Sequence, residues 1–419
     1  MPIEKYTDLL VLLFLALFVP AGLGQDASAG TTVPGSDERV LYQFLGNADG
    51  HHPVGGVILG QGGKIYGTTI DGGSSHCGTV YQLNFSIFWK QTILHSFACG
   101  PGDGSKPREG LVLDRFGNLY GVTSTGGAFG HGIVFKLTPS SSGWSETVMH
   151  DFAGGNDGDS PSSSLVLDRS DNLYGVTFFG GSANCNGHGC GTVFEMEQTT
   201  SGWSESLLYT FDGADGKQPR SLVFDNSGNL YGVILNGGEF GGGTIFKLSH
   251  AMSGWEEAVL YSFTGRADGT HPWGGLVFDS AGNLYGTTAG KIFGSCSAPT
   301  CGTVFELQPQ AGIWKLKTLY TFQGADGATP LGGLISDAAG NLFGTTLNGG
   351  AFSVGSVFEL SPSATGWTET LLHSFPYSSL ADDDGKHPAS GLAIDQTGKL
   401  FGAAEDGPYG DGSVFAIKP

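Results

Sequence analysis

The residues best suited to bind a ligand are those that depart from an internal repeat. A D-G-x-x-P turn recurs along the chain, and most copies place small residues directly after the proline. Three copies instead carry Arg108 and Glu109, Arg220, and Trp273. An aromatic ring beside guanidinium groups can hold a sugar by stacking and a carboxylate by paired hydrogen bonds. We therefore expect these four residues to contact a ligand; the alternative is that Trp273 only plugs the centre of the fold.

Histidines form a second group at the same turns. His52, His271 and His387 directly precede the proline, where the other copies have lysine, serine, glutamine or threonine. Imidazole is a common metal ligand, but no ordered spacing of cysteine and histidine accompanies these residues. We expect the three histidines to contact the same ligand, and we predict neither a metal ion nor another cofactor.

The six cysteines fall into pairs that suit disulfides. Two pairs are five residues apart in equivalent loops, and the remaining two cysteines lie in loops that are expected to open onto one face. Short spans across a loop are compatible with disulfide distances, and disulfides persist in exported proteins. The predicted bonds are Cys77–Cys99, Cys185–Cys190 and Cys296–Cys301.

Most of the repeated acids are better explained as turn residues. A ring of carboxylates could bind a cation or a sugar, but aspartate also caps backbone N–H groups where glycine and proline complete a turn. Presence in every unit favours the turn. The D-G-x-x-P acids are Asp49, Asp103, Asp157, Asp215, Asp268, Asp326 and Asp384, and those of a D-x-x-G-N turn are Asp114, Asp168, Asp225, Asp279, Asp337 and Asp395.

The elements that position these residues are seven repeats of four short strands. A tetrapeptide of the form N/K-L/I-Y/F-G starts at Lys64, Asn118, Asn172, Asn229, Asn283, Asn341 and Lys399. Each unit has four apolar runs, such as Leu276–Asp279, Leu284–Thr288, Thr303–Leu307 and Lys317–Phe322. This period predicts an all-β, seven-bladed β-propeller with four strands per blade. A solenoid would instead need atypical capping repeats at its ends.

The two ends of the pattern complement each other. Residues 39–44 match the fourth run of a unit, and residues 412–417 match the third. The N-terminal strand is therefore expected to complete the last blade and to close the ring, which removes the exposed strand edges.

The repeat resembles the GloVer tandem repeat. The matching residues are Leu284–Thr288 with Gly302–Leu307, and Leu342–Gly350 with Gly355–Phe358. The resemblance covers about residues 38–419. It implies a bacterial secreted or surface protein and implies no catalytic residues.

Composition narrows the class of partner. The net charge of −20, with 19 basic and 39 acidic residues, argues against nucleic acid or an anionic membrane as the main partner. Residues 1–29 are interpreted as a signal peptide and short linker, and residues 36–419 as one propeller domain. We expect a monomer without a membrane span after signal cleavage, located outside the cell, in the periplasm or at the cell surface.

These observations favour a secreted, non-catalytic protein that binds or adheres to an extracellular polysaccharide or a surface protein. One alternative is a polysaccharide lyase or glycoside hydrolase, for which the candidate acids are Glu109, Glu239, Glu405 and Asp406. These acids match no familiar motif. The other alternative is a purely structural protein of the cell envelope.

Overall fold

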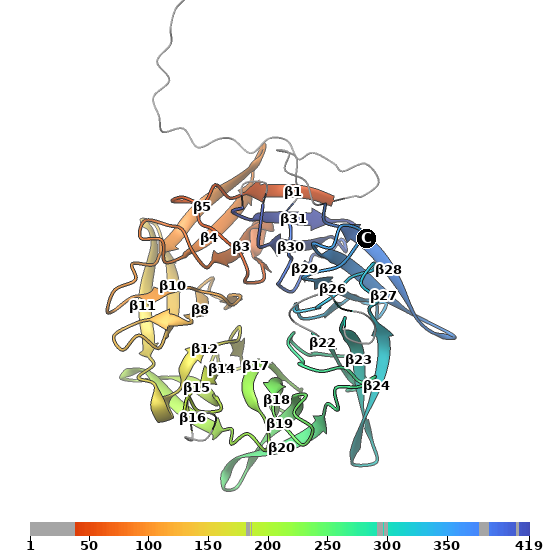
Figure 1. The fold of residues 1–419 in the computed structure, drawn as a ribbon. Helices are drawn as coiled ribbons and strands as arrows, with labels where there is room; N and C mark the ends of the chain where they lie inside the picture. Colours follow the sequence, from red (N-terminus) through yellow and green to blue (C-terminus); the bar gives the residue numbers. More distant parts are fainter. Residues whose placement is uncertain are drawn as a thin grey trace, which may run out of the picture.

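Seven antiparallel sheets stand around a central axis in the computed structural model (Figure 1). The structure describes residues 38–181, 185, 187–290, 296, 301–376, 385–407 and 410–419. The predicted signal peptide lies outside these residues. No helix in the described ranges is long and apolar enough to cross a membrane.

The first six blades follow one another along the chain, each with its four strands in order from the centre outwards. Blade 1 has β2 (Ile58–Leu59), β3 (Ile65–Thr69), β4 (Thr79–Phe85) and β5 (Trp89–Ser96), and blade 2 has β7 (Val112–Leu113), β8 (Leu119–Thr123), β10 (Ile133–Ser140) and β11 (Gly143–Asp151). Blade 3 has β13 (Val166–Leu167), β14 (Leu173–Phe179), β15 (Thr192–Thr199) and β16 (Gly202–Thr210), and blade 4 has β17 (Lys217–Phe224), β18 (Leu230–Asn236), β19 (Thr244–Ala251) and β20 (Gly254–Ser262). Blade 5 has β21 (Val277–Phe278), β22 (Leu284–Thr288), β23 (Thr303–Gln310) and β24 (Ile313–Thr321), and blade 6 has β25 (Ile335–Ser336), β26 (Leu342–Thr346), β27 (Ser356–Ser363) and β28 (Gly366–Ser374).

Blade 7 joins the two ends of the described chain. It consists of β29 (Ala393–Ile394), β30 (Leu400–Ala404), β31 (Ser413–Ile417) and, outermost, β1 (Glu38–Gln43). Strand β1 runs antiparallel to β31, with Glu38 opposite Ile417 and Gln43 opposite Ser413. Figure 1 shows this pair as the red and blue strands that meet at the ring's seam. The predicted seven-bladed ring and its closure are confirmed.

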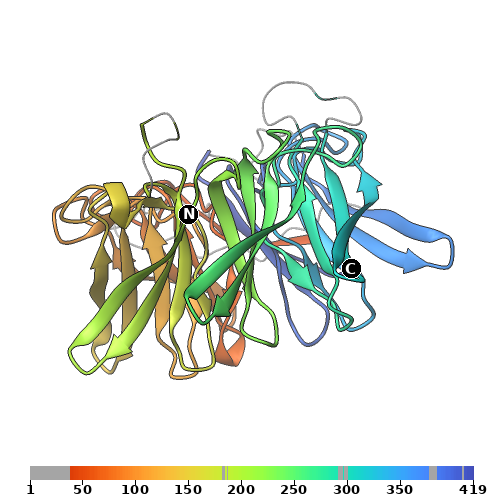
Figure 2. The ribbon, with the colours of Figure 1, turned by 90° about the horizontal axis from the view of Figure 1, so that it is seen from below.

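A few short elements lie outside this plan. Strands β6 (Gly104–Ser105) and β9 (Thr125–Gly126) form a small ladder in blade 2, and β12 (Asp159–Pro161) adds to β14. Two single turns of 3₁₀ helix are η1 (Gln61–Gly63) and η2 (Gly155–Asp157). Seen edge-on in Figure 2, the strands run between the two faces of the ring, so the loops gather on those faces.

The innermost strands have two residues in six blades, shorter than the sequence predicts, whereas β17 of blade 4 has eight. The outer hairpins are longer than predicted. In blade 5 the expected strands 276–279 and 317–322 are Val277–Phe278 and Ile313–Thr321. Crowding at the axis accounts for the first difference, because the segments before these strands pack against neighbouring blades. A Cβ atom on Gly274 would lie 2.4 Å from the carbonyl oxygen of Gly332, so only glycine fits there.

A ring of aromatic pairs holds each blade to the next. In each pair, one ring follows the outermost strand of a blade and the other lies in the third strand of its neighbour, with centroids 5.1–5.4 Å apart in an edge-to-face arrangement. The pairs are Phe44–Tyr81, Phe97–Phe135, Phe152–Phe194, Phe211–Phe246, Phe263–Phe305, Phe322–Phe358 and Phe375–Phe415. The closing junction at Phe44 therefore repeats the packing of the other six.

The repeated aspartates act within their turns. The Asp268 carboxylate accepts a hydrogen bond of 2.7 Å from the backbone N–H of Thr264, and the Asp279 carboxylate accepts one of 2.9 Å from that of Asn283. Equivalent bonds recur at the other described copies, whereas Asp384 lies outside the described residues. These bonds account for the repetition without any ligand.

Buried carboxyl groups recur between blades on the outer strands. Glu146, Glu205, Glu257 and Glu369 each lie two residues after the strand's tryptophan, and one carboxyl oxygen of each is buried without a hydrogen-bond partner among the described residues. Burial raises the pKa of each to about 7, and a nearby aspartate adds to the shift. Blade 1 has Gln91 at this position; its amide donates to the Asp49 carbonyl oxygen and accepts from the Tyr42 hydroxyl. A neutral side chain therefore suits the position.

Candidate functional site

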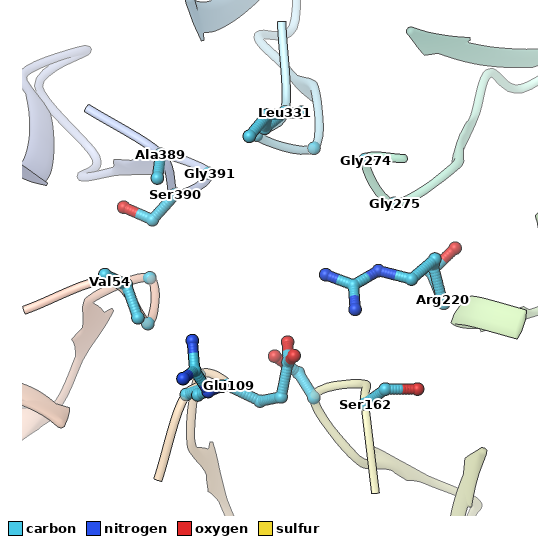
Figure 3. Close-up of a pocket in the computed structure, with 18 of the residues that line it drawn as sticks. Val54, Glu109, Ser162, Arg220, Gly274, Gly275, Leu331, Ala389, Ser390 and Gly391 are labelled. Atoms are coloured by element: carbon cyan, nitrogen blue, oxygen red, sulfur yellow. The ribbon is translucent and has the colours of Figure 1, made fainter. Parts of the chain in front are cut away.

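A cavity of about 840 Å³ occupies the centre of the ring. Its wall is built by the short segments that follow the proline of the D-G-x-x-P turn in all seven blades (Figure 3). These segments are Val54–Gly56, Arg108–Leu111, Ser162–Ser164, Arg220–Leu222, Trp273–Gly275, Leu331–Gly333 and Ala389–Leu392. The side chain at this position in each blade therefore decides the chemistry of the cavity.

The structure brings the four expected residues to this one cavity. Arg108, Glu109, Arg220 and Trp273 all line it. Figure 3 shows the side chains of Arg220 and Glu109 extending from their blades into the open centre. Trp273 does not plug the channel, since the cavity remains beside it.

Arg220 is held by two aromatic rings. Its guanidinium carbon lies 4.1 Å from the centroid of the Trp273 ring and 5.6 Å from that of Phe178. Both distances are within the range of cation–π attraction. The guanidinium therefore covers one face of the Trp273 ring.

Charge inside the cavity is unlike that of the whole protein. Lys106, Arg108 and Arg220 line it together with Glu109 and Glu405. Burial raises the pKa of Glu109, opposed by the charges of Arg220 and Arg108. Burial and the charge of Asp406 raise the pKa of Glu405, opposed by His52, His387 and Arg108. Three basic and two acidic side chains thus line the cavity of a chain whose net charge is −20.

Two of the three expected histidines come together at the seam between blades 1 and 7. His52 Nδ1 lies 3.4 Å from Asp71 Oδ2, and His52 Nε2 lies 3.9 Å from Asp406 Oδ1. His387 Nδ1 lies 2.8 Å from Asp406 Oδ2, and this hydrogen bond lowers the pKa of Asp406. The result is an alternating row, Asp71–His52–Asp406–His387, beside Glu405 in the cavity wall.

His271 is separate from this row. Its Nδ1 contacts the Gly290 carbonyl oxygen at 3.3 Å. None of the three histidines is among the described residues that line the central cavity. A backbone constraint is common to this position, because the residue before the proline has a positive φ of 54–67° in all seven blades. These residues are His52, Lys106, Ser160, Gln218, His271, Thr329 and His387. The positive φ thus recurs in every blade because the turn itself is strained, whichever side chain the residue carries.

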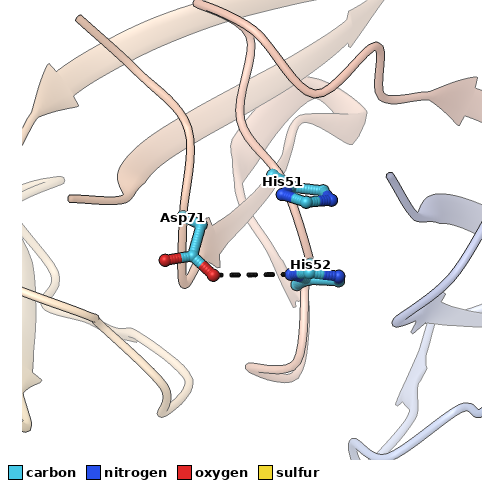
Figure 4. A group of neighbouring side chains, drawn as sticks. All are labelled: His51, His52 and Asp71. Carbon is cyan, nitrogen blue, oxygen red and sulfur yellow. Dashed lines mark hydrogen bonds and ion pairs between the residues drawn. The ribbon is translucent and has the colours of Figure 1, made fainter. Parts of the chain in front are cut away.

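Three groups of described residues have the composition of a metal site, and their geometry argues against one. His51, His52 and Asp71 are close together, but the two imidazole rings are stacked with centroids 3.6 Å apart, as Figure 4 shows. The in-plane lone pairs of stacked rings do not converge on one ion. The other groups are His95–Asp103–Glu146 and His150–Asp157–Glu205. In other blades a tyrosine, such as Tyr209, takes the histidine's place and donates to the turn aspartate, so a donor role accounts for His95 and His150.

The loops between the second and third strands alternate around the ring. Blades 1, 3 and 5 carry the three predicted disulfides, Cys77–Cys99, Cys185–Cys190 and Cys296–Cys301, with Cα–Cα distances of 5.5, 5.1 and 5.1 Å. Blades 2, 4 and 6 instead place Phe129, Phe240 and Phe352 at the loop, with 61%, 55% and 53% of each residue exposed. The sequence analysis missed this alternation, although the string G-G-x-F in alternate units signals it.

The roles of Phe178 and Asp71 at the site were also not predicted from the sequence. Aligning the seven units identifies Asp71, because only Asp71 and Asp406 are acidic at a place where the other units have Thr125, Phe179, Asn236, Gly290 and Asn348. No signal in the sequence links Phe178 to Arg220, since the cation–π contact crosses between blades.

Known proteins resemble this chain in its repeat and in its fold. The model of a family described as Gloeobacter/Verrucomicrobia repeat matches residues 29–188 and 185–415. No curated protein matches the sequence.

Three of the solved structures that match this fold come from extracellular or periplasmic proteins. The extracellular domains of BT4673 and BT3049 from B. thetaiotaomicron match with TM-scores of 0.56 and 0.52 at 10% and 12% identity, over 90% and 92% of this chain. The chain covers 39% and 41% of those two chains. The periplasmic gluconolactonase PpgL of Pseudomonas aeruginosa matches with a TM-score of 0.50 at 17% identity, over 82% of this chain and 93% of that one. At these identities the likeness is one of fold alone.

Proposed function

We propose that this chain, which belongs to the Gloeobacter/Verrucomicrobia repeat family, is a secreted, non-catalytic binding protein. In this proposal, its central cavity holds an extracellular saccharide. The observation that carries the proposal is Arg220, stacked on Trp273 and directed into a cavity of about 840 Å³. Concave sites with a few fixed polar groups on an apolar wall are typical of ligand pockets.

The wall of the cavity suits a polar ligand of moderate size. Glycine-rich segments such as Gly55–Gly56 and Gly274–Gly275 line it, and without side chains they leave their backbone groups open to a ligand. Basic and acidic side chains line the same wall, which supports a polar ligand over an apolar one.

An extracellular location is supported by two features. The three disulfides are of the kind that persist in oxidising compartments. The N-terminal residues expected to form a signal peptide would direct the chain there.

Hydrolysis of the saccharide is the less favoured function. A glycosidase uses two carboxyl groups, of which one is ionised and the other protonated. Glu109 and Glu405 both line the cavity, but the pKa of each is raised, so the two are not tuned to opposite roles.

Binding to a glycan array by the secreted, oxidised protein tests the proposal. We expect at least one glycan to bind, and Trp273→Ala to weaken binding by roughly tenfold through the loss of cation–π support for Arg220. Phe116→Ala is the control, since Phe116 is 70% exposed and absent from the cavity wall. No signal on any glycan would contradict the proposal, and release of new reducing ends would favour the hydrolase.

A further inference from the structure

We propose that the saccharide held in the cavity carries a carboxylate, as in a uronic acid residue, and that Arg220 is the group that binds it. This inference rests on the proposed function and names the class of its ligand. It follows from the surroundings of the guanidinium, from the charge of the cavity and from the shape of the donor.

The guanidinium of Arg220 lacks the partners that a buried cation normally has. A guanidinium offers five N–H donors, and the faces of Trp273 and Phe178 attract the charge but accept no strong hydrogen bond. Its Nε is buried with no hydrogen-bond partner among the described residues. The end of the guanidinium is turned toward the open centre (Figure 3), so its terminal N–H groups are the donors that an oxyanion of the ligand can reach.

No fixed anion compensates this charge. Within the described part of the chain, no ion pair joins Arg220 to a carboxylate, whereas Arg115 on another surface forms one with Asp171 at 2.7 Å. Glu109 is the acid whose charge acts on Arg220. Burial raises the pKa of Glu109 and lowers that of Arg220, and among the described residues no ion pair joins the two side chains. The cavity therefore holds a cation that a ligand anion can pair with.

The restraint on Arg220 favours a planar anion. The rings of Trp273 and Phe178 restrict the guanidinium, and Figure 3 shows its nitrogen atoms turned toward the open centre. The edge of a guanidinium matches the two oxygens of a carboxylate through parallel hydrogen bonds. A sulfate ester offers similar oxygens, so the experiment must separate the two anions.

Oligogalacturonate and its methyl ester provide a matched pair of probes, because they differ only in the charge of the carboxyl groups. Binding to the full, oxidised chain is measured by calorimetry at low salt, with alginate, glucuronate-containing and sulfated carrageenan oligosaccharides beside them. We expect at least one uronate to bind and to lose roughly 10- to 100-fold in affinity when it is esterified, the range set by a hydrogen bond to a charged group.

Variants assign the effect to Arg220. Arg220→Gln should reduce uronate affinity to that of the ester, and Arg220→Lys should give an intermediate value, because lysine keeps the charge but not the paired donors. Arg115→Gln, at an exposed arginine outside the cavity, is the control and should change nothing. If Arg220→Gln does not fold, Arg220→Lys still tests the role of Arg220, and the comparison of acid and ester on the unaltered chain tests the class of ligand.

The outcomes separate the inference from the proposed function. Equal affinity for acid and ester, or binding of neutral glycans alone, would overturn the inference and leave a saccharide-binding protein. Binding of the sulfated probe without any uronate would also overturn it. Failure of every saccharide on the array would defeat both.

Discussion

Tyr81 stands where the other six blade junctions have phenylalanine. The residue is fully buried, and its hydroxyl has no hydrogen-bond partner among the described residues. Phenylalanine, which the other six blades have at this position, therefore suits it better than tyrosine does.

Tyr81→Phe should stabilise the protein. The edge-to-face contact with Phe44 remains, while the cost of an unpaired buried hydroxyl, about 1–3 kcal/mol, is removed. Denaturant unfolding of the oxidised protein measures the change. Phe135→Tyr at the equivalent place in blade 2 is the matched reverse change and should destabilise. A loss of stability in Tyr81→Phe would show that the hydroxyl has a partner in solution.

At the scale of single residues, four of the seven side chains singled out from the sequence line the cavity, and their contacts were not predicted. Arg108, Glu109, Arg220 and Trp273 were identifiable because they break a repeated pattern at one position. The stack of Arg220 on Trp273 was not, because the two residues belong to adjacent blades and meet only through the geometry of the ring. For the same reason, the approach of His52 to Asp406 joins residues from opposite ends of the chain.

At the scale of the strand, the buried glutamates between blades make stability depend on pH. Their pKa is about 7 in the folded protein, above the ordinary value of 4.5. The folded state thus binds more protons than the unfolded state between these values, and stability is lost as the pH rises through them. The turn aspartates act in the opposite sense, because their lowered pKa values make stability fall at lower pH.

We therefore expect the free energy of unfolding to decrease between about pH 4.5 and 7. Replacing Glu146, Glu205, Glu257 and Glu369 together with glutamine should flatten this dependence, since blade 1 already has Gln91 there. Denaturant unfolding at several pH values measures both chains, and Glu239→Gln, at an exposed loop residue, is the control. If the unfolding free energy of the fourfold variant still changes with pH as in the unaltered chain, these carboxyl groups are not the cause of the pH dependence.

Strand positions followed from the sequence more closely than strand lengths did. Four apolar runs per unit indicate four strands, because each run and its turn are local features. The two-residue inner strands depend on how closely neighbouring blades approach at the axis, where Gly274 meets Gly332, and no local pattern contains that distance.

At the scale of the whole molecule, closure by β1 predicts that the seam is as strong as any other junction. Phe44 and Phe263 are both buried and both form edge-to-face pairs with the neighbouring blade. Each also donates a backbone hydrogen bond to the glycine that precedes the third strand of its own blade. Phe44→Ala and Phe263→Ala should therefore each cost about 3–5 kcal/mol in unfolding free energy. A much smaller cost for Phe44→Ala would mean that the ring is stable without its N-terminal strand.

The alternation of disulfide loops and exposed phenylalanines cannot continue around the full circle, because seven is odd. A pattern with a period of two must meet a mismatch once per turn, so the blades are not equivalent. The row of histidines and aspartates marks the seam between blades 7 and 1 in a different way. Each blade can therefore be distinguished from the others by its position relative to the seam. Arg220 lies in one blade only, so a ligand in the cavity meets it from one direction. A ring that looks symmetrical can therefore hold an asymmetrical molecule in a single orientation.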